Sequence, residues 1–147
     1  MNQEVSVTLT RQTKYQFTVD FGGTLAPMLA DEPAPLGDDA GPSPTQLLAT
    51  AVGCCMSSSL LFASGRSKED AGAVKTTVTC AIGRNERNRL RVLAMKVDMT
   101  LGVEPQTLPH LDQVLAQFED FCTVSQSVQT GIPMSVTVRS PDGRILK

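Results

Sequence analysis

Apolar and polar residues alternate along the first twenty residues of the chain. Apolar side chains recur at every second position in residues 3–10 and again in residues 14–21, with the polar run RQTK between them. Alternation at period two is typical of a strand with one buried face, and a short polar run is long enough for a hairpin turn. We therefore predict two paired strands over these ranges and a third strand at 24–29, after a turn at Gly22 and Gly23.

An acidic loop and a long uncharged helix are predicted next. Residues 30–44 are rich in Pro, Gly and Asp, a composition that excludes a helix. Pro44 fits the first helical position, where no hydrogen bond is lost, and Ser43 fits the N-cap before it. The predicted helix runs from Pro44 to about Ala63 and ends at Gly65.

The second half of the chain predicts two further strands, two helices and a last strand. Residues 74–82 and 93–101 alternate on either side of the charged turn GRNERNR, whereas apolar residues in 105–121 recur at helical spacing. A short helix at 123–130 and a strand at 134–138 follow. The resulting order, βββ-α-ββ-α-α-β, predicts an α+β fold in a single domain over residues 1–147.

Composition narrows the classes of partner. The formal net charge is -2 and no long block of like charges occurs, which argues against a nucleic-acid partner. Aromatic residues make up 4% of the chain, so the core must be built from smaller side chains, and this favours further burial in a homodimer. The N-terminus lacks the pattern of a signal peptide, so we expect a cytoplasmic protein.

The uncharged stretch 41–65 admits two interpretations. It is long enough to cross a bilayer, but about half of it is Ser, Thr, Gln, Gly or Cys, and no aromatic belt marks its ends. We therefore predict no membrane span. A helix that is apolar or small on every side in a soluble protein must be surrounded by protein, so it is predicted to pack on a sheet and on a partner subunit. Gly53 is predicted to allow close packing there.

Four cysteines and a single histidine limit the chemistry. No CxxC pair occurs, which argues against a disulfide framework and a structural zinc site, and no metal or cofactor is expected. Cys80 lies on the predicted inner face of its strand and is interpreted as a core residue. Cys54 and Cys55 are neighbours on a helix and point about 100° apart, so they cannot form an unstrained mutual disulfide. His110 is assigned no role.

Cys122 has a different setting, at the predicted break between two helices. The free N–H groups at a helix N-terminus lower a thiol pKa and stabilise the thiolate, so a reactive cysteine is one interpretation. An ordinary buried cysteine is the other. The sequence spacing leaves open whether Cys122 meets a thiol of the central helix.

Two segments carry a resemblance to a known family. GPSPTQLLATAVGCCMSSSLL resembles the GPxPxxLLxxAxGxC helix of the OsmC/Ohr family, the osmotically induced and organic hydroperoxide resistance proteins. FEDFCTVSQSVQTGIPMSVTV is similar to the family's second-cysteine segment, and the predicted order of elements matches as well. The resemblance implies an OsmC-like α+β fold with a long central helix packed on sheets in an intertwined homodimer.

The resemblance also implies a function. The family's reactive cysteine lies eleven residues after the helix-starting proline, a position held here by Cys55, which leaves Cys54 as a packing residue. Cys122 matches the second cysteine. The implied activity is reduction of organic hydroperoxides: Cys55 is oxidised to a sulfenic acid, Cys122 condenses with it to a disulfide, and an external dithiol reduces the disulfide.

The chain departs from the family pattern around the reactive cysteine. The family uses an arginine from the N-terminal region and a glutamate directly after the helix-starting proline, but Thr45 occupies the second position here. Arg11 is assigned as the supporting arginine, with a solvated turn residue as the alternative. Glu32 of the acidic loop is assigned as a substitute carboxylate, with Asp31 as the alternative. Without a nearby cation, burial is expected to raise the pKa of Cys55. The missing glutamate favours an alternative function, a non-enzymatic dimer that senses redox state or binds a small ligand.

Overall fold

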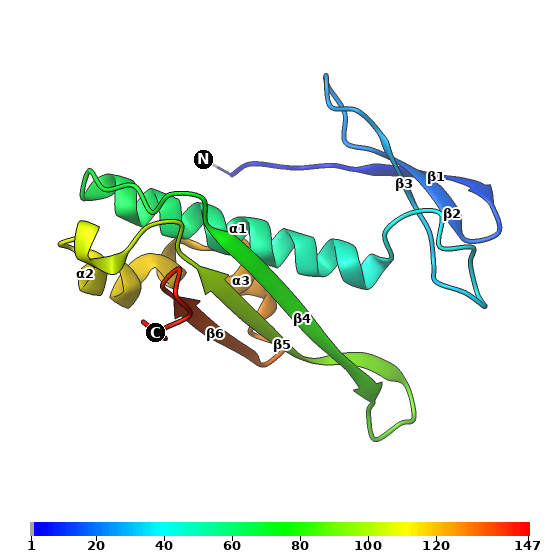
Figure 1. Ribbon diagram of the computed structural model, residues 1–147. Helices are drawn as coiled ribbons and strands as arrows, with labels where there is room; N and C mark the ends of the chain where they lie inside the picture. Colours follow the sequence, from blue (N-terminus) through cyan, green and yellow to red (C-terminus); the bar gives the residue numbers. More distant parts are fainter. Residues whose placement is uncertain (1) are drawn as a thin grey trace. The chain divides into compact units, whose positions relative to one another are not determined.

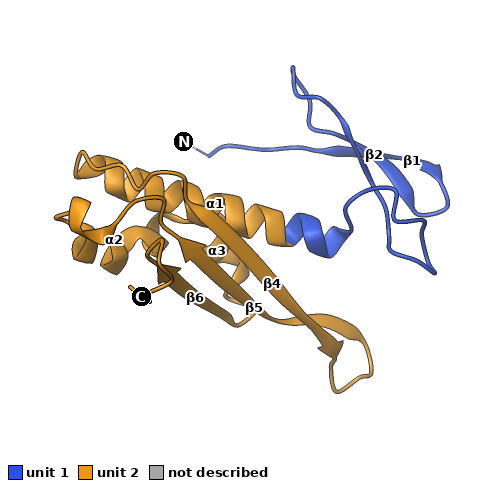
Figure 2. Ribbon diagram, viewed as in Figure 1, with its two compact units in different colours: residues 1–48 blue, residues 49–147 orange. Residues whose placement is uncertain are grey.

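The computed structural model describes residues 2–147 and contains both helices and sheets (Figure 1). The chain divides into two compact units, one ending at Leu48 and one running from Ala49 to Lys147 (Figure 2). The order of its strands and α-helices is βββ-α-ββ-α-α-β, which confirms the predicted α+β class. The assignment of residues 1–147 to a single domain stays a prediction.

The first unit contains a three-stranded antiparallel sheet in the order β1-β2-β3. Its strands are β1 (Thr8–Thr13), β2 (Gln16–Asp20) and β3 (Met28–Ala30). The predicted strand bounds are wrong here, because β1 continues through Thr13 and the hairpin turns at Lys14, the last residue of RQTK, whose φ is 44°. Every residue of β1 is exposed, so the alternation of apolar and polar side chains does not correspond to a buried face. The alternation therefore could not predict where the strand begins and ends.

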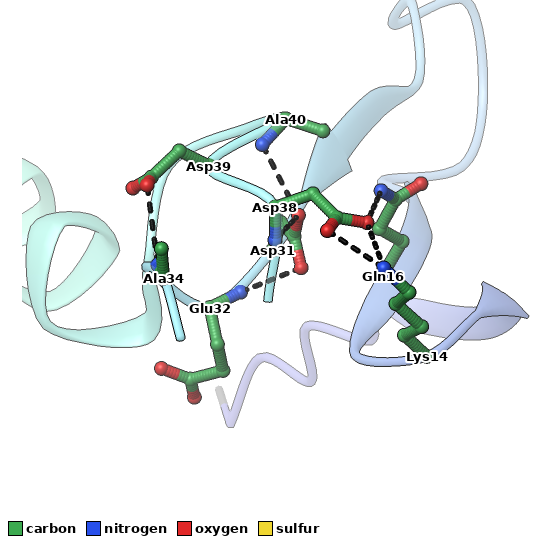
Figure 3. A network of polar contacts seen from close by, with 8 residues as sticks. All are labelled: Lys14, Gln16, Asp31, Glu32, Ala34, Asp38, Asp39 and Ala40. Carbon is green, nitrogen blue, oxygen red and sulfur yellow. Dashed lines mark hydrogen bonds and ion pairs between the residues drawn. The ribbon is translucent and has the colours of Figure 1, made fainter. Parts of the chain in front are cut away.

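Asp31 organises the loop between β3 and the long helix (Figure 3). Its buried carboxylate accepts hydrogen bonds from the backbone N–H groups of Glu32, Asp38 and Ala40, at 2.8, 3.0 and 3.1 Å. Burial opposes ionisation, but these three bonds outweigh it and lower the pKa of Asp31. A Cβ at Gly37 would lie 2.1 Å from the Glu32 carbonyl oxygen, so the loop closes this tightly only around glycine.

The long helix α1 (Pro44–Arg66) starts at the predicted residue. The Ser43 hydroxyl accepts the Gln46 N–H at 3.2 Å, and the Gln46 side-chain oxygen accepts the Ser43 N–H at 2.8 Å, a reciprocal capping box. The predicted end is wrong, because the helix continues through Gly65 to Arg66. Lys68, with a φ of 57°, takes the left-handed conformation that closes the helix instead.

In the second unit α1 packs on a sheet of order β4-β5-β6 (Figure 1). Strands β4 (Lys75–Arg84) and β5 (Leu90–Thr100) are antiparallel, whereas β6 (Met134–Arg139) runs parallel to β5. A Cβ at Gly53 would lie 3.0 Å from the Val78 side chain, so this glycine brings the helix close to β4, as predicted. Fully or almost fully buried side chains of this layer are Val52, Met56, Leu60, Met95, Val97, Met99 and Val138.

The helix predicted over 105–121 is wrong as a single element. It divides into a 3-10 turn η1 (Pro105–Thr107), α2 (Leu111–Gln117) and a second 3-10 turn η2 (Phe118–Phe121), followed by α3 (Thr123–Val128). Pro109 explains the first break, because a residue before proline is driven from the helical conformation; Leu108 has φ -120° and ψ 81°. The predicted apolar stripe is nevertheless turned inward, with Leu108, Leu111, Leu115 and Phe118 buried.

One side of α1 is left open within the chain. Leu61 and Phe62 are 44% and 56% exposed, so the chain by itself does not cover the helix on every side, and the predicted cover by a partner subunit stays a prediction. The helix is long and apolar enough to cross a membrane by length and composition alone. However, Val52, Met56 and Leu60 are buried within the second unit, as in the core helix of a soluble protein.

Candidate thiol site

Two cysteines that lie 67 positions apart in the sequence meet in the second unit. Cys55 belongs to the middle of α1, and Cys122 is the N-cap residue of α3 with extended backbone angles, φ -85° and ψ 95°. Cys55 Sγ lies against the start of α3, two residues after Cys122, and the two thiols are close enough for each to shift the pKa of the other. The prediction that Cys122 stands at a break between helices is confirmed, and its neighbour is the cysteine that the family motif selects.

The start of α3 supplies one backbone N–H group to each sulfur. The Val124 N–H donates to Cys55 Sγ at 3.5 Å, and the Ser125 N–H donates to Cys122 Sγ at 3.4 Å. These N–H groups have no partner within the helix because they belong to its first turn. The N-terminus of α3 therefore donates a hydrogen bond to the sulfur of Cys55 and another to the sulfur of Cys122.

The two sulfurs differ in exposure and in pKa. Burial raises the pKa of Cys55, which is partly exposed, and its hydrogen bond to Cys122 raises it further. Cys122 is fully buried, and burial alone would raise its pKa as well. Hydrogen bonds from the Cys55 thiol, from the hydroxyl and N–H of Ser125 and from the Ser59 hydroxyl outweigh burial, so the pKa of Cys122 is lowered.

An apolar pocket of about 340 Å³ opens beside Cys55. Phe62 and Phe121 form one wall, with ring centroids 5.2 Å apart in an edge-to-face arrangement. The Arg66 guanidinium lies 5.5 Å from the centroid of the Phe121 ring. Sequence reasoning missed this pocket, although Phe62 stands seven residues after Cys55 and therefore on the same helix face. The lining residues are Cys55, Ser58, Ser59, Phe62 and Phe121.

The predicted supporting residues both lie in the first unit. Arg11 belongs to strand β1 and not to a turn; its Nε donates to the Lys14 carbonyl oxygen at 2.8 Å. Glu32 is half-buried, and its side chain points away from the Asp31 network (Figure 3). It lines a second pocket, of about 220 Å³, together with Tyr15 and other residues of the same unit. The supporting roles of Arg11 and Glu32 stay predictions.

The other predicted residues have structural surroundings. Cys54 is exposed, so the prediction that it packs in the core is wrong for the single chain. It precedes Cys55 on α1, and one residue turns the side-chain direction by about 100°, away from Cys122. Cys80 is half-buried on β4, where burial raises its pKa. His110 donates its backbone N–H to Glu69 Oε1 at 2.8 Å, and its ring Nδ1 lies 2.7 Å from the same oxygen. This contact joins the segment after α1 to the start of α2.

The groups that hydrogen-bond the two sulfurs are electrically neutral. They are the backbone N–H groups of Val124 and Ser125. Gln46, close to the position of the family's glutamate, caps α1 through Ser43. Within residues 2–147 no cluster of three or more His, Cys, Asp or Glu side chains is arranged to hold a metal ion.

A family model for OsmC, described as OsmC-like protein, matches residues 37–137. This match covers more than half of the chain and includes both cysteines. The chain belongs to the OsmC-like protein family. No curated protein sequence matches this OsmC-like chain.

Solved structures share the fold of this OsmC-like protein at low sequence identity. A Psychrobacter arcticus protein ascribed to the osmotic stress and detoxification response has a TM-score of 0.78 at 20% identity, over 95% of this chain and 98% of that one. An organic hydroperoxide resistance protein from Elizabethkingia anophelis has a TM-score of 0.73 at 18% identity, over 95% and 99% of the two chains. The organic hydroperoxide resistance protein OhrB of Bacillus subtilis gives 0.71 at 13% identity, over 93% and 98%. These likenesses establish the OsmC/Ohr fold.

Proposed function

We propose that this OsmC-like protein is a thiol-dependent peroxidase that reduces organic hydroperoxides through Cys55 and Cys122. The observation that carries the proposal is the meeting of Cys55 and Cys122 at the first turn of α3, with the Cys55 sulfur beside an apolar pocket. Family membership supports it, as do the organic hydroperoxide resistance proteins that share the fold.

The two cysteines have different tasks in the proposed reaction. Cys55 attacks the outer peroxide oxygen, an alcohol leaves, and a sulfenic acid remains on Cys55. Cys122 then condenses with the sulfenic acid and releases water; its burial and the backbone N–H groups that the first turn of α3 donates to both sulfurs support this task. An external dithiol then reduces the disulfide by thiol exchange. The rings of Phe62 and Phe121 give the organic group of the substrate an apolar surface.

We also propose a homodimer in the cytoplasm. The open side of α1, with Leu61 and Phe62 exposed, and the exposed apolar residues of the first unit favour burial against a second copy. Free cysteines persist in a reducing compartment, and the mechanism needs them. Light scattering on the purified protein tests the dimer: we expect a mass twice the 15.7 kDa of the chain, and a monomer would contradict the proposal.

Peroxide turnover tests the catalytic function. The reduced protein is mixed with cumene hydroperoxide and an excess of dithiothreitol, and peroxide loss is followed. We expect the wild type to consume many equivalents of peroxide and Cys55→Ser to consume none. Cys80→Ser is the matched control, because Cys80 is also half-buried, and it should behave as the wild type does. Full turnover by Cys55→Ser would refute the mechanism. Consumption of a single equivalent by the wild type would instead support the redox-sensing alternative, which the raised pKa of Cys55 favours.

A further inference from the structure

We infer that the hairpin between β4 and β5 carries a second binding site, which takes a small organic molecule with two adjacent phosphate groups. The site is lined by Arg84, Arg87 and Arg91 and shares no residue with the pocket beside Cys55. The inference therefore goes beyond the proposed peroxidase function and does not rest on it. It concerns the segment GRNERNR, to which that function gives no task.

Positive charge is concentrated in this hairpin. Residues 84–91 hold four arginines and one glutamate, in a chain whose formal net charge is -2. The pairing of β4 with β5 extends to Arg84 and Leu90, whereas β6 pairs with β5 only from Met95 onward. The arginines therefore lie on the end of the hairpin that extends past β6 (Figure 1).

The loop at this end is held by its own hydrogen bonds. Asn85 Oδ1 accepts the backbone N–H groups of Arg87 and Arg89, both at 3.0 Å, and the Asn85 N–H donates to the Arg89 carbonyl oxygen at 2.9 Å. Asn88 has a φ of 59°, and its carbonyl oxygen accepts Arg84 Nη1 at 2.9 Å. The backbone that carries the arginines is thus ordered before a ligand binds, which lowers the entropic cost of binding.

Three of the four arginines face one cavity of about 450 Å³. Its lining residues are Arg84, Asn85, Glu86, Arg87 and Arg91. This volume is within the range of about 300–1,000 Å³ that is usual for small-molecule sites. Among residues 2–147, no carboxylate forms an ion pair with any of the three guanidinium groups. Like charges around one cavity repel one another, and a bound anion relieves that repulsion.

The donors of this cavity match phosphate groups. A guanidinium group presents parallel N–H donors that bind two phosphate oxygens at once. Three such groups around a cavity of this size fit two adjacent phosphates better than one compact anion. Glu86 has no ion-pair partner among the described residues, and its carboxylate can accept a hydrogen bond from a hydroxyl or amino group. An organic diphosphate, such as a nucleoside diphosphate, supplies both kinds of group.

Isothermal titration calorimetry tests the site with ADP, inorganic pyrophosphate and sulfate. The purified protein is titrated without magnesium, because the metal would neutralise the phosphates. We expect ADP and pyrophosphate to bind at one site per chain, sulfate to bind at least about 10-fold more weakly, and all affinities to fall as salt is added. Absence of ADP binding, or equal affinity for sulfate and ADP, would overturn the inference.

Variants of the hairpin locate the bound anion. Arg87→Gln and Arg91→Gln should each weaken ADP binding by about 10-fold, as expected when a hydrogen bond to a charged group is lost. Arg89→Gln is the matched control, because it removes the same charge from the same loop but Arg89 does not line the cavity, and it should change the affinity little. If Arg89→Gln weakens ADP binding as much as Arg87→Gln does, the attraction is general and the site is refuted.

Two more substitutions separate donor geometry from charge. Arg87→Lys keeps the charge but loses the paired donors, so it should weaken ADP binding several-fold. Glu86→Gln removes a negative charge from the cavity, so it should tighten pyrophosphate binding several-fold. A pyrophosphate affinity that is unchanged or weaker in Glu86→Gln would contradict the placement of the anion. All four residues 86, 87, 89 and 91 are exposed, so equal urea midpoints are expected and show that the variants fold.

Polyanions of other classes provide the last comparison. Phosphate groups also occur on DNA and on lipid surfaces, and both attract arginine. A short DNA duplex is tested by fluorescence anisotropy, and vesicles with phosphatidylglycerol are tested by co-sedimentation, at the salt concentration used for ADP. We expect neither to bind as tightly as ADP. Tighter binding of the duplex or of the vesicles would overturn the assignment to a small molecule. Peroxide turnover is measured separately, and neither outcome there bears on this site.

Discussion

Oxidation of the Cys55–Cys122 pair is expected to stabilise the protein against unfolding. The disulfide would close a loop of about 67 residues, which removes about 4 kcal/mol of conformational freedom from the unfolded chain in the entropic model. Oxidation also removes the hydrogen bonds made by the reduced sulfurs, at about 1–2 kcal/mol. Both sulfurs accept N–H groups from the first turn of α3 and therefore lie on the same side of that helix end, which favours bond formation between them. We therefore expect a net gain of about 2–3 kcal/mol.

Urea unfolding measures this gain. Reduced protein and protein oxidised with cumene hydroperoxide are compared in a Cys54→Ala background, because Cys54 is exposed and would otherwise cross-link chains. At a urea dependence of about 2 kcal/mol per M, the gain raises the midpoint by about 1 M or slightly more. The same treatment of Cys54→Ala/Cys122→Ser should leave the midpoint unchanged, which separates the disulfide from other oxidation.

One result would refute the reasoning about this site. If mass spectrometry shows the Cys55–Cys122 disulfide and the oxidised protein unfolds at the same or a lower urea concentration, then the fold must be strained to form the bond. The first turn of α3 would then fail to hold the two reduced sulfurs in a geometry that suits the bond, although it donates an N–H group to each of them.

Three further substitutions test the fold and the pocket. Asp31→Asn should lower the urea midpoint at pH 7. Because the pKa of Asp31 is lowered in the fold, the carboxylate stabilises the fold fully above the ordinary Asp pKa, and this contribution is lost as the pH falls through the lowered value. The urea midpoints of the two proteins should therefore converge in acid. Equal midpoints at pH 7 would contradict this. Leu60→Ala should reduce the free energy of unfolding by about 2–5 kcal/mol, since Leu60 is fully buried, and a loss below 1 kcal/mol would show that the helix is less firmly packed. Phe121→Ala should raise KM several-fold for cumene hydroperoxide with little effect on hydrogen peroxide, and an equal effect on both substrates would argue against the apolar wall.

Local signals in the sequence predicted the buried elements well. The start of α1 could be predicted because its capping box is formed within four consecutive residues, from Ser43 to Gln46. Strand β5 could be predicted because alternate residues from Met95 onward are buried. Strand β1 could not be placed correctly, since it has no buried face. The inward-facing apolar stripe of 105–121 was predicted correctly. The prediction of one continuous helix was wrong, because it ignored the break that Pro109 imposes.

The site required information that no local pattern contains. The position of Cys122 at a helix start follows from neighbouring residues, but its contact with Cys55 depends on how α3 packs against α1. Only the family resemblance selected Cys55 over Cys54. Ser59 was overlooked among three consecutive serines, although its spacing of four from Cys55 places it on the same face of the helix.

The absent glutamate bears on the reactivity of Cys55. A buried Cys55 without a charged partner is expected to have a raised pKa, and burial does raise it. The raised pKa lowers the fraction of Cys55 that is thiolate at neutral pH. A thiol with a raised pKa is, however, the stronger nucleophile once it is deprotonated. The loss of the carboxylate that the family places after the helix-starting proline therefore reduces the amount of reactive thiolate, but not the reactivity of the thiolate that forms.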